Sequence, residues 1–90
     1  MIYIYTDKYD EDWSEHFNKL DNESKVRVAK KIGKIIEFPK KRHLGGRAKF
    51  FVGEVGQNRI TYRIFDDKKE VRFYFVGSHK DYEKWYKQFF

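Results

Sequence analysis

The spacing of apolar residues changes once along this chain of 90 residues, from a helical repeat to an alternating one. Trp13, Phe17 and Leu20 follow one another at helical intervals, which predicts a helix of about three turns. A second apolar stripe consists of Val28, Ala29, Ile32, Ile35 and Ile36. The polar step at residues 21–22 separates the two stripes and Pro39 ends the second, so we expect an antiparallel helical hairpin.

From residue 50 onward, apolar side chains alternate with polar ones, as they do in strands. Three segments predict an antiparallel meander: 50–55, 59–65 and 71–76. We expect the helical hairpin to cover the sheet face that carries Ile60, Tyr62 and Ile64. The side chains predicted for the opposite, open face are those of Arg59, Thr61 and Arg63.

The two ends of the chain complete the predicted order. Residues 2–5 are β-branched and aromatic and predict a first strand. The residues that could cap the first helix are Thr6, Asp7 and Asp10. Residues 78–81 have the S-x-x-[DE] form of a capping box and predict a last helix. The expected fold is therefore α+β in the order β-α-α-β-β-β-α, with residues 1–90 as a single domain and the helices on one face of the sheet.

Positive charge is concentrated in one block of the chain. The net charge is +6, yet residues 25–49 hold ten Lys and Arg against Glu37 alone. This concentration predicts a surface for phosphate groups, with a solvated helix face as the alternative. The candidates for RNA contact are Lys41, Arg42, His43, Arg47, Arg63 and Lys80. Phe50, Phe51 and Tyr74 are aromatic residues near this block that could stack on bases, although such rings more often belong to the core.

Several classes of site are excluded by composition. The chain has no Cys, so it has no disulfide, zinc–thiolate site or thiol nucleophile. His16, His43 and His79 have no metal-ligand spacing with one another or with the carboxylates, and we expect no metal or other cofactor. No apolar stretch approaches the ~20 residues of a membrane span, so we expect a cytoplasmic protein without a membrane partner.

His79 is the residue best placed for acid–base chemistry. It stands at the first position of the predicted last helix, directly after a strand and a glycine, where helix amides favour an anion. A histidine beside a phosphate can act as a general acid or base, although an exposed histidine without a role fits the same position. Tyr82 follows one helical turn later and could orient a group or donate a proton to a leaving oxygen.

The pattern resembles the RelE/ParE superfamily of toxins from type II toxin–antitoxin systems. The likeness rests on the element order, on the Leu-Gly-Gly step at residues 44–46 and on N-R-I-T-Y-R-I at residues 58–64. The strand V-R-F-Y-F-V-G, which runs into S-H-K-D-Y-E-K, adds to it. The H-x-x-Y-[DE]-K run that begins at His79 is similar to the ending of HigB-like members.

The resemblance implies a ribosome-dependent endoribonuclease that cuts mRNA without a metal, by attack of the 2′-OH on the adjacent phosphate. It implies that Arg59 holds the phosphate, that His79 and Tyr82 take the HigB-like catalytic positions, and that Lys49 stands for the lysines of the first meander strand. The implied partners are the ribosome, mRNA and a cognate antitoxin that covers the basic face.

This chain also departs from the RelE pattern. It has Val52, Gly53 and Glu54 where RelE proper carries strand lysines, and Trp85 where RelE has its C-terminal Tyr. These differences favour a HigB-type, His-based mechanism over a RelE-type one. A ParE-like gyrase poison that cuts no RNA, or an inactive RNA-binding member, is the alternative.

Overall fold

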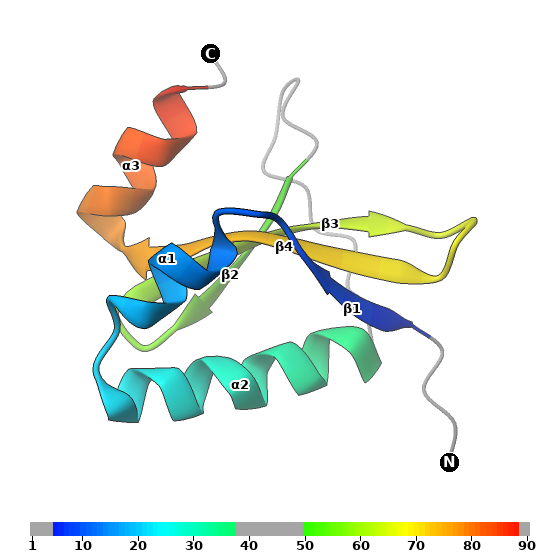
Figure 1. Cartoon of the computed structure of the whole chain (residues 1–90), viewed down its shortest axis with the longest axis horizontal. Helices are drawn as coiled ribbons and strands as arrows, with labels where there is room; N and C mark the ends of the chain where they lie inside the picture. The colour runs from blue at the N-terminus through cyan, green and yellow to red at the C-terminus, as the bar shows by residue number, and fades with distance from the viewer. Residues whose placement is uncertain (1–4, 38–49, 89–90) are drawn as a thin grey trace.

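The structure is a computed structural model that describes residues 5–37 and 50–88 of the chain. Its elements, in chain order, are β1 (Thr6–Tyr9), α1 (Trp13–Asn18), α2 (Asn22–Glu37), β2 (Phe51–Val55), β3 (Asn58–Phe65), β4 (Glu70–Ser78) and α3 (His79–Lys87). The predicted α+β class and element order are confirmed (Figure 1).

The four strands form one sheet in the order β1-β4-β3-β2. The strands β2, β3 and β4 make the predicted antiparallel meander, and β1 joins the sheet parallel to β4. The helices α1 and α2 lie in the crossover that connects β1 at one edge of the sheet to β2 at the other, and β3 and β4 then fill the space between them. The crossover lays α2 along one face of the sheet (Figure 1).

The core lies between α2 and this face, as the sequence predicts. Val28, Ile32 and Ile35 are the buried residues of α2. Opposite them, the sheet buries Ile60 and Tyr62 of β3 together with Val71, Phe73 and Val76 of β4. Ile64 is partly buried against the same cluster. The alternation of β3 therefore turns its apolar side chains toward the helix.

The described part of the first strand begins later than predicted. Residues 2–4 lie outside the described residues, and the strand that the structure shows is Thr6–Tyr9, so Thr6 and Asp7 are strand residues and not helix caps. The Thr6 amide donates to the Lys69 carbonyl at 2.9 Å, and the Asp10 amide donates to the Phe73 carbonyl at 2.9 Å. Pairing with β4 satisfies these backbone groups, which outweighs the local capping preference.

The first helix is shorter than predicted. It has six residues, begins at Trp13, and has Asp12 at its N-cap without a side-chain cap hydrogen bond. The predicted break before the second helix is confirmed, because the Ser24 amide donates to Asp21 Oδ1 at 2.7 Å. The predicted capping box is confirmed at α3, where the Asp81 amide donates to Ser78 Oγ at 3.2 Å.

The expectation that all helices share one face is wrong. The last helix, α3, rises from the face opposite α2 (Figure 1). A bulge in the β3–β4 ladder aligns Thr61 with Phe75 and Tyr62 with Phe73, which leaves Tyr74 as the extra residue. The Phe75 ring then packs against the Trp85 ring of α3 at 5.4 Å. Thr61, predicted to be displayed, is instead fully buried, and its hydroxyl has no partner among the described residues.

None of the helices within the described residues is long and apolar enough to cross a membrane.

The packing of α3 against the sheet predicts that a side chain at position 77 destabilises the folded protein. A Cβ there would lie 2.8 Å from the tip of the Phe75 ring, which the rings of Tyr82 and Trp85 hold in place. We expect Gly77→Ala to lower the free energy of unfolding by about 1–3 kcal/mol in urea denaturation.

Gly33→Ala is the matched control, because a Cβ at Gly33 in α2 meets nothing within 4 Å. It should raise stability by about 0.5–1 kcal/mol through helix propensity. Equal effects of the two substitutions would contradict the account of α3 docking.

Candidate nucleic-acid interface

Arg59 places a positively charged guanidinium near the junction of β4 and α3. It lies on the sheet face opposite α2, and the register pairs it with Gly77, two residues before His79. Its guanidinium carbon lies 5.2 Å from the centre of the Tyr82 ring. Nη2 of Arg59 is 3.9 Å from a Glu54 carboxylate oxygen, and the Arg59 side chain is 30% exposed. The guanidinium is thus fixed against a ring yet open to a phosphate.

Tyr82 is packed between α3 and the sheet and is only 6% exposed. Its ring contacts those of Phe75 and Tyr86. Burial raises the pKa of Tyr82 and the neighbouring Tyr86 adds to this effect, while the charge of Arg59 lowers that pKa in part. The phenol is therefore a protonated hydrogen-bond donor at neutral pH and not a base.

His79 begins α3 and lies at the surface. Its Nε2 is 3.2 Å from Oε2 of Glu83, and both side chains are more than half exposed. A carboxylate on one ring nitrogen fixes the orientation of the imidazole and leaves the other nitrogen free to exchange a proton. Glu83 was not predicted as this partner, although its spacing of four residues from His79 within a predicted helix signals the contact.

A groove of about 600 Å³ runs beside His79, between the first half of α2, the β2–β3 turn and the start of α3. Lys80, a predicted RNA-contact residue, lines this groove. Arg27 of α2 lines it from the other side and forms an ion pair with Glu23 at 3.1 Å. Arg27 was not predicted, because nothing in its local pattern distinguishes it from the other cations of that helix.

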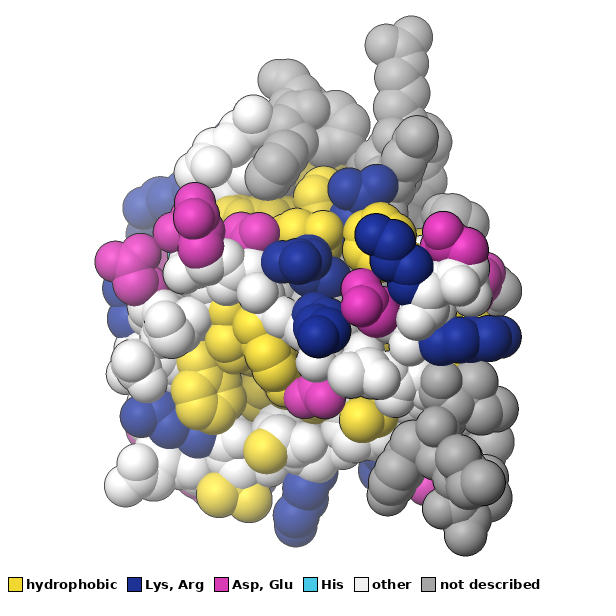
Figure 2. Space-filling view, turned by 45° about the vertical axis from the view of Figure 1, so that its right-hand side comes forward, with side chains coloured by type: hydrophobic (Ala, Val, Ile, Leu, Met, Phe, Trp, Pro, Cys, Tyr) yellow, Lys and Arg dark blue, Asp and Glu magenta, His cyan; other side chains and the backbone are white. Residues whose placement is uncertain are grey.

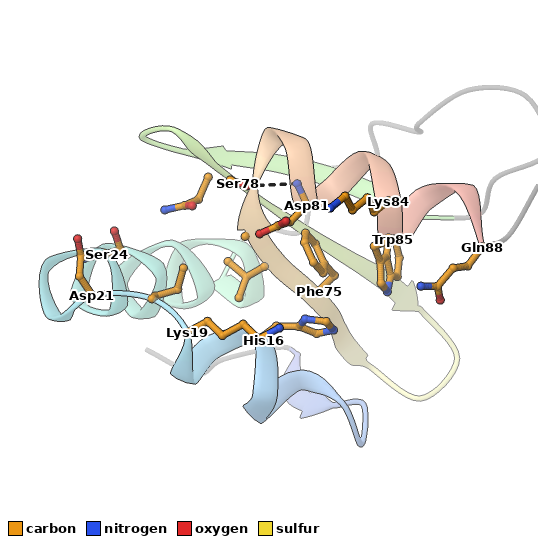
Figure 3. A pocket seen from close by; sticks show the side chains of 14 residues that line it. His16, Lys19, Asp21, Ser24, Phe75, Ser78, Asp81, Lys84, Trp85 and Gln88 are labelled. Atoms are coloured by element: carbon orange, nitrogen blue, oxygen red, sulfur yellow. Dashed lines mark hydrogen bonds between the residues drawn. The ribbon is translucent and has the colours of Figure 1, made fainter.

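A second groove, of about 430 Å³, lies between α1 and α3 and shares Ser24, Asn58 and Ser78 with the first (Figure 3). The His16 ring faces Phe75 there at 4.7 Å, and burial lowers the pKa of His16, with the Lys19 charge as a further cause. Asp21 and Asp81 also line this groove. Lys19 and Lys84 balance these two carboxylates, so the groove carries no excess of positive charge from its Lys, Asp and Glu side chains.

The structure places the predicted aromatic and basic candidates in different environments. Phe51 as a stacking residue is wrong, because it is buried on the α2 side against Tyr62. Phe50 and Tyr74 lie together, with ring centres 5.1 Å apart. Arg63 lies on the same face as Arg59, four residues further along β3. The candidates that lie outside the described residues are Lys41, Arg42, His43, Arg47 and Lys49, and their roles stay predictions.

Solved toxin structures share this architecture. The isolated E. coli RelE toxin superposes with a TM-score of 0.74 at 22% identity, over 96% of this chain and 99% of that one. RelE in the E. coli RelBE toxin–antitoxin complex gives 0.74 at 23% identity, over 82% and 95%. The Mycobacterium tuberculosis RelBE2 toxin–antitoxin complex gives 0.75 at 23%, over 83% and 98%. The chain has the RelE fold.

No family model and no curated protein sequence matches the chain, so the likeness rests on three-dimensional structure. Within this RelE fold, the described residues contain no group of three or more His, Asp or Glu side chains arranged to hold a metal. Arg59 and Tyr82 offer a cation and a protonated phenol, and His79 offers an imidazole at the start of α3.

The raised pKa of Tyr82 predicts how stability changes in alkali. The unfolded chain loses this proton near the usual value of 10.0, while the folded protein retains it to higher pH. The folded state then binds more protons, so stability falls as pH rises above about 10. Tyr82→Phe should make this fall less steep in urea denaturation at several pH values.

Tyr62→Phe is the matched control on the other sheet face and should act in the same direction, because burial also raises the pKa of Tyr62. An unchanged slope in both variants would contradict the account.

Proposed function

We propose that the protein is the toxin of a type II toxin–antitoxin system and that it cuts mRNA on the ribosome. The RelE fold supports the toxin class. The observation that carries the ribonuclease proposal is the guanidinium of Arg59 over the Tyr82 ring, beside the helix start at which His79 stands. These residues come from one strand, β3, and one helix, α3, and together they meet the needs of phosphodiester cleavage.

Each group has a separate task in the proposed reaction. The 2′-oxygen of the ribose attacks the neighbouring phosphorus, the bond to the 5′-oxygen breaks, and a 2′,3′-cyclic phosphate remains. Arg59 binds the phosphate oxygens as they gain charge. His79, oriented by Glu83, transfers the proton that leaves the 2′-oxygen or the proton that reaches the 5′-oxygen.

Tyr82 is proposed as a positioning residue. Its ring lies under the Arg59 guanidinium, and its hydroxyl is nearly excluded from solvent in the free protein. The use of His79 at this position supports the HigB-like branch proposed from the sequence. Lys49 and Lys80 would add positive charge around the bound strand.

The proposed partners follow from the same surface. Similar solved structures include toxin–antitoxin complexes from E. coli and from Mycobacterium tuberculosis. We propose that a cognate antitoxin covers the basic face of this protein, and that the toxin acts in the cytoplasm on ribosome-bound mRNA. A segment with acidic residues can bind such a face with complementary charge.

The test is cleavage of mRNA on purified ribosomes, with transcript ends mapped after induced expression. We expect cuts inside translated messages and a rate that falls by about 10²–10⁴-fold in His79→Ala. Arg59→Ala should lose about 10²–10³-fold, because it removes one group that binds the developing charge. Lys30→Ala is the control, because Lys30 is an exposed cation of α2.

Two results would contradict the proposal. One is full activity of both the Arg59 and the His79 variants as folded proteins. The other is growth arrest with intact transcripts and inhibited gyrase, the outcome that a ParE-like protein would give.

A distinct prediction concerns the geometry of Arg59. Arg59→Lys keeps the charge but lacks the planar fork and the stacking on Tyr82. We expect cleavage to fall by at least tenfold while the thermal midpoint changes by less than a few degrees. Lys30→Arg on α2 should leave cleavage unchanged, since Lys30 is an exposed residue that lines neither groove. Wild-type activity in Arg59→Lys would show that charge alone is sufficient.

A further inference from the structure

A row of basic side chains crosses three strands near the β3–β4 hairpin. Arg63 of β3 is paired with Arg72 of β4, and Arg72 is paired with Lys8 of β1. Arg72 stands between Val71 and Phe73, both fully buried on the α2 side, so it projects to the opposite face. Paired residues share a face, and we call Lys8, Arg72 and Arg63 the basic row.

The charges of the basic row are not neutralised within the described part of the chain. No carboxylate lies within ion-pairing distance of these three side chains there. Arg72 Nη1 donates to the backbone carbonyl of Tyr9 at 3.3 Å, which is an uncharged partner. Like charges directly opposite each other weaken a sheet, so the Arg63–Arg72 pair is a cost to the free protein. An anionic ligand would remove that cost.

Aromatic rings flank the same cations. The Arg63 guanidinium carbon lies 5.8 Å from the centre of the Phe50 ring and 5.3 Å from that of Phe65. Phe50 in turn contacts Tyr74, and all three rings are partly exposed. In a view turned toward this end of the molecule, Lys and Arg side chains lie beside apolar ones, with Asp and Glu side chains among them (Figure 2). Cations interleaved with accessible rings are typical of surfaces that bind single-stranded nucleic acid.

We infer that the basic row is a second RNA-binding site, separate from the site at Arg59. Arg63 and Arg72 bind backbone phosphates, Lys8 adds charge at the sheet edge, and the half-buried Phe65 ring beside Arg63 receives a base. The inference rests on the proposed function in taking RNA as the ligand. Arg63 is four residues from Arg59, or about 13 Å along β3, so one strand can contact both sites.

The test is the salt dependence of binding between the isolated protein and a short fluorescent oligouridine, followed by anisotropy. Each phosphate contact contributes about 0.7 to the slope of log affinity against log salt. The double variant Arg63→Gln/Arg72→Gln should therefore bind more weakly, with a slope smaller by about 1.4. Lys30→Gln/Lys34→Gln removes the same charge from exposed positions of α2 and should leave the slope nearly unchanged.

A second pair of variants separates charge from folding. Arg63→Lys/Arg72→Lys keeps both charges and should retain the slope while weakening base stacking. The Gln double variant should melt at the same or a higher temperature, because the like-charge pair is gone. If it fails to fold, the single variants Arg63→Gln and Arg72→Gln each have an expected slope decrease of about 0.7.

The inference is overturned if the Gln double variant keeps the wild-type slope, or if it loses binding to an acidic peptide and not to RNA. These outcomes are independent of cleavage. A protein that cuts no mRNA but shows the slope change has the second site without the proposed function. One that cuts mRNA with an unchanged slope has the function without this site.

Discussion

The bulge between β3 and β4 determines the side on which the functional chemistry is built. Without the bulge, the side chains of Phe73 and Phe75 would point to the same face of the sheet, as residues two apart do in a regular strand. With it, Thr61 is aligned with Phe75, and the Phe75 ring supports α3 on the face opposite the core. The position of α3 in turn places the Tyr82 ring under Arg59. The absence of a side chain at Gly77 leaves the space that the Phe75 ring fills.

The two faces of the sheet have separate roles. The face toward α2 is apolar and closed, with Ile60, Val71 and Phe73 fully buried. The other face carries arginines: Arg59 and Arg63 lie against aromatic rings, and Arg59 also lies 3.9 Å from a Glu54 carboxylate oxygen. A ring under a guanidinium orients it without neutralising its charge. This arrangement suits a protein that binds a polyanion on one face while its stability comes from the other.

Much of the fold could be predicted because local signals and tertiary packing agree. The α2 stripe, the alternation of β3 and the capping box at Ser78 each fix an element whatever surrounds it. Thr6–Tyr9 carries polar residues, so its strand depends on backbone pairing with β4, which a local pattern does not encode. The bulge likewise arises from the match of two strands, so the burial of Thr61 and the packing of α3 could not be predicted from either strand alone.

The residues of the candidate site divide in the same way, into those that a local pattern identifies and those that only contacts between elements identify. Arg59, His79 and Tyr82 are identifiable from strand alternation, a helix start and helical spacing. Glu83 as the partner of His79 and Arg72 as the partner of Arg63 emerge only when contact or register is known. Arginines in different strands look unrelated in the sequence, and the sheet makes them neighbours.

The account is tested most directly by a structure of the protein on a ribosome that carries an mRNA with 2′-O-methyl groups, which block attack on the phosphate. The account predicts one backbone phosphate within hydrogen-bonding distance of the Arg59 guanidinium, with the imidazole of His79 beside the adjacent 2′-oxygen. An mRNA bound on the α2 side, or a scissile phosphate remote from both residues, would contradict it.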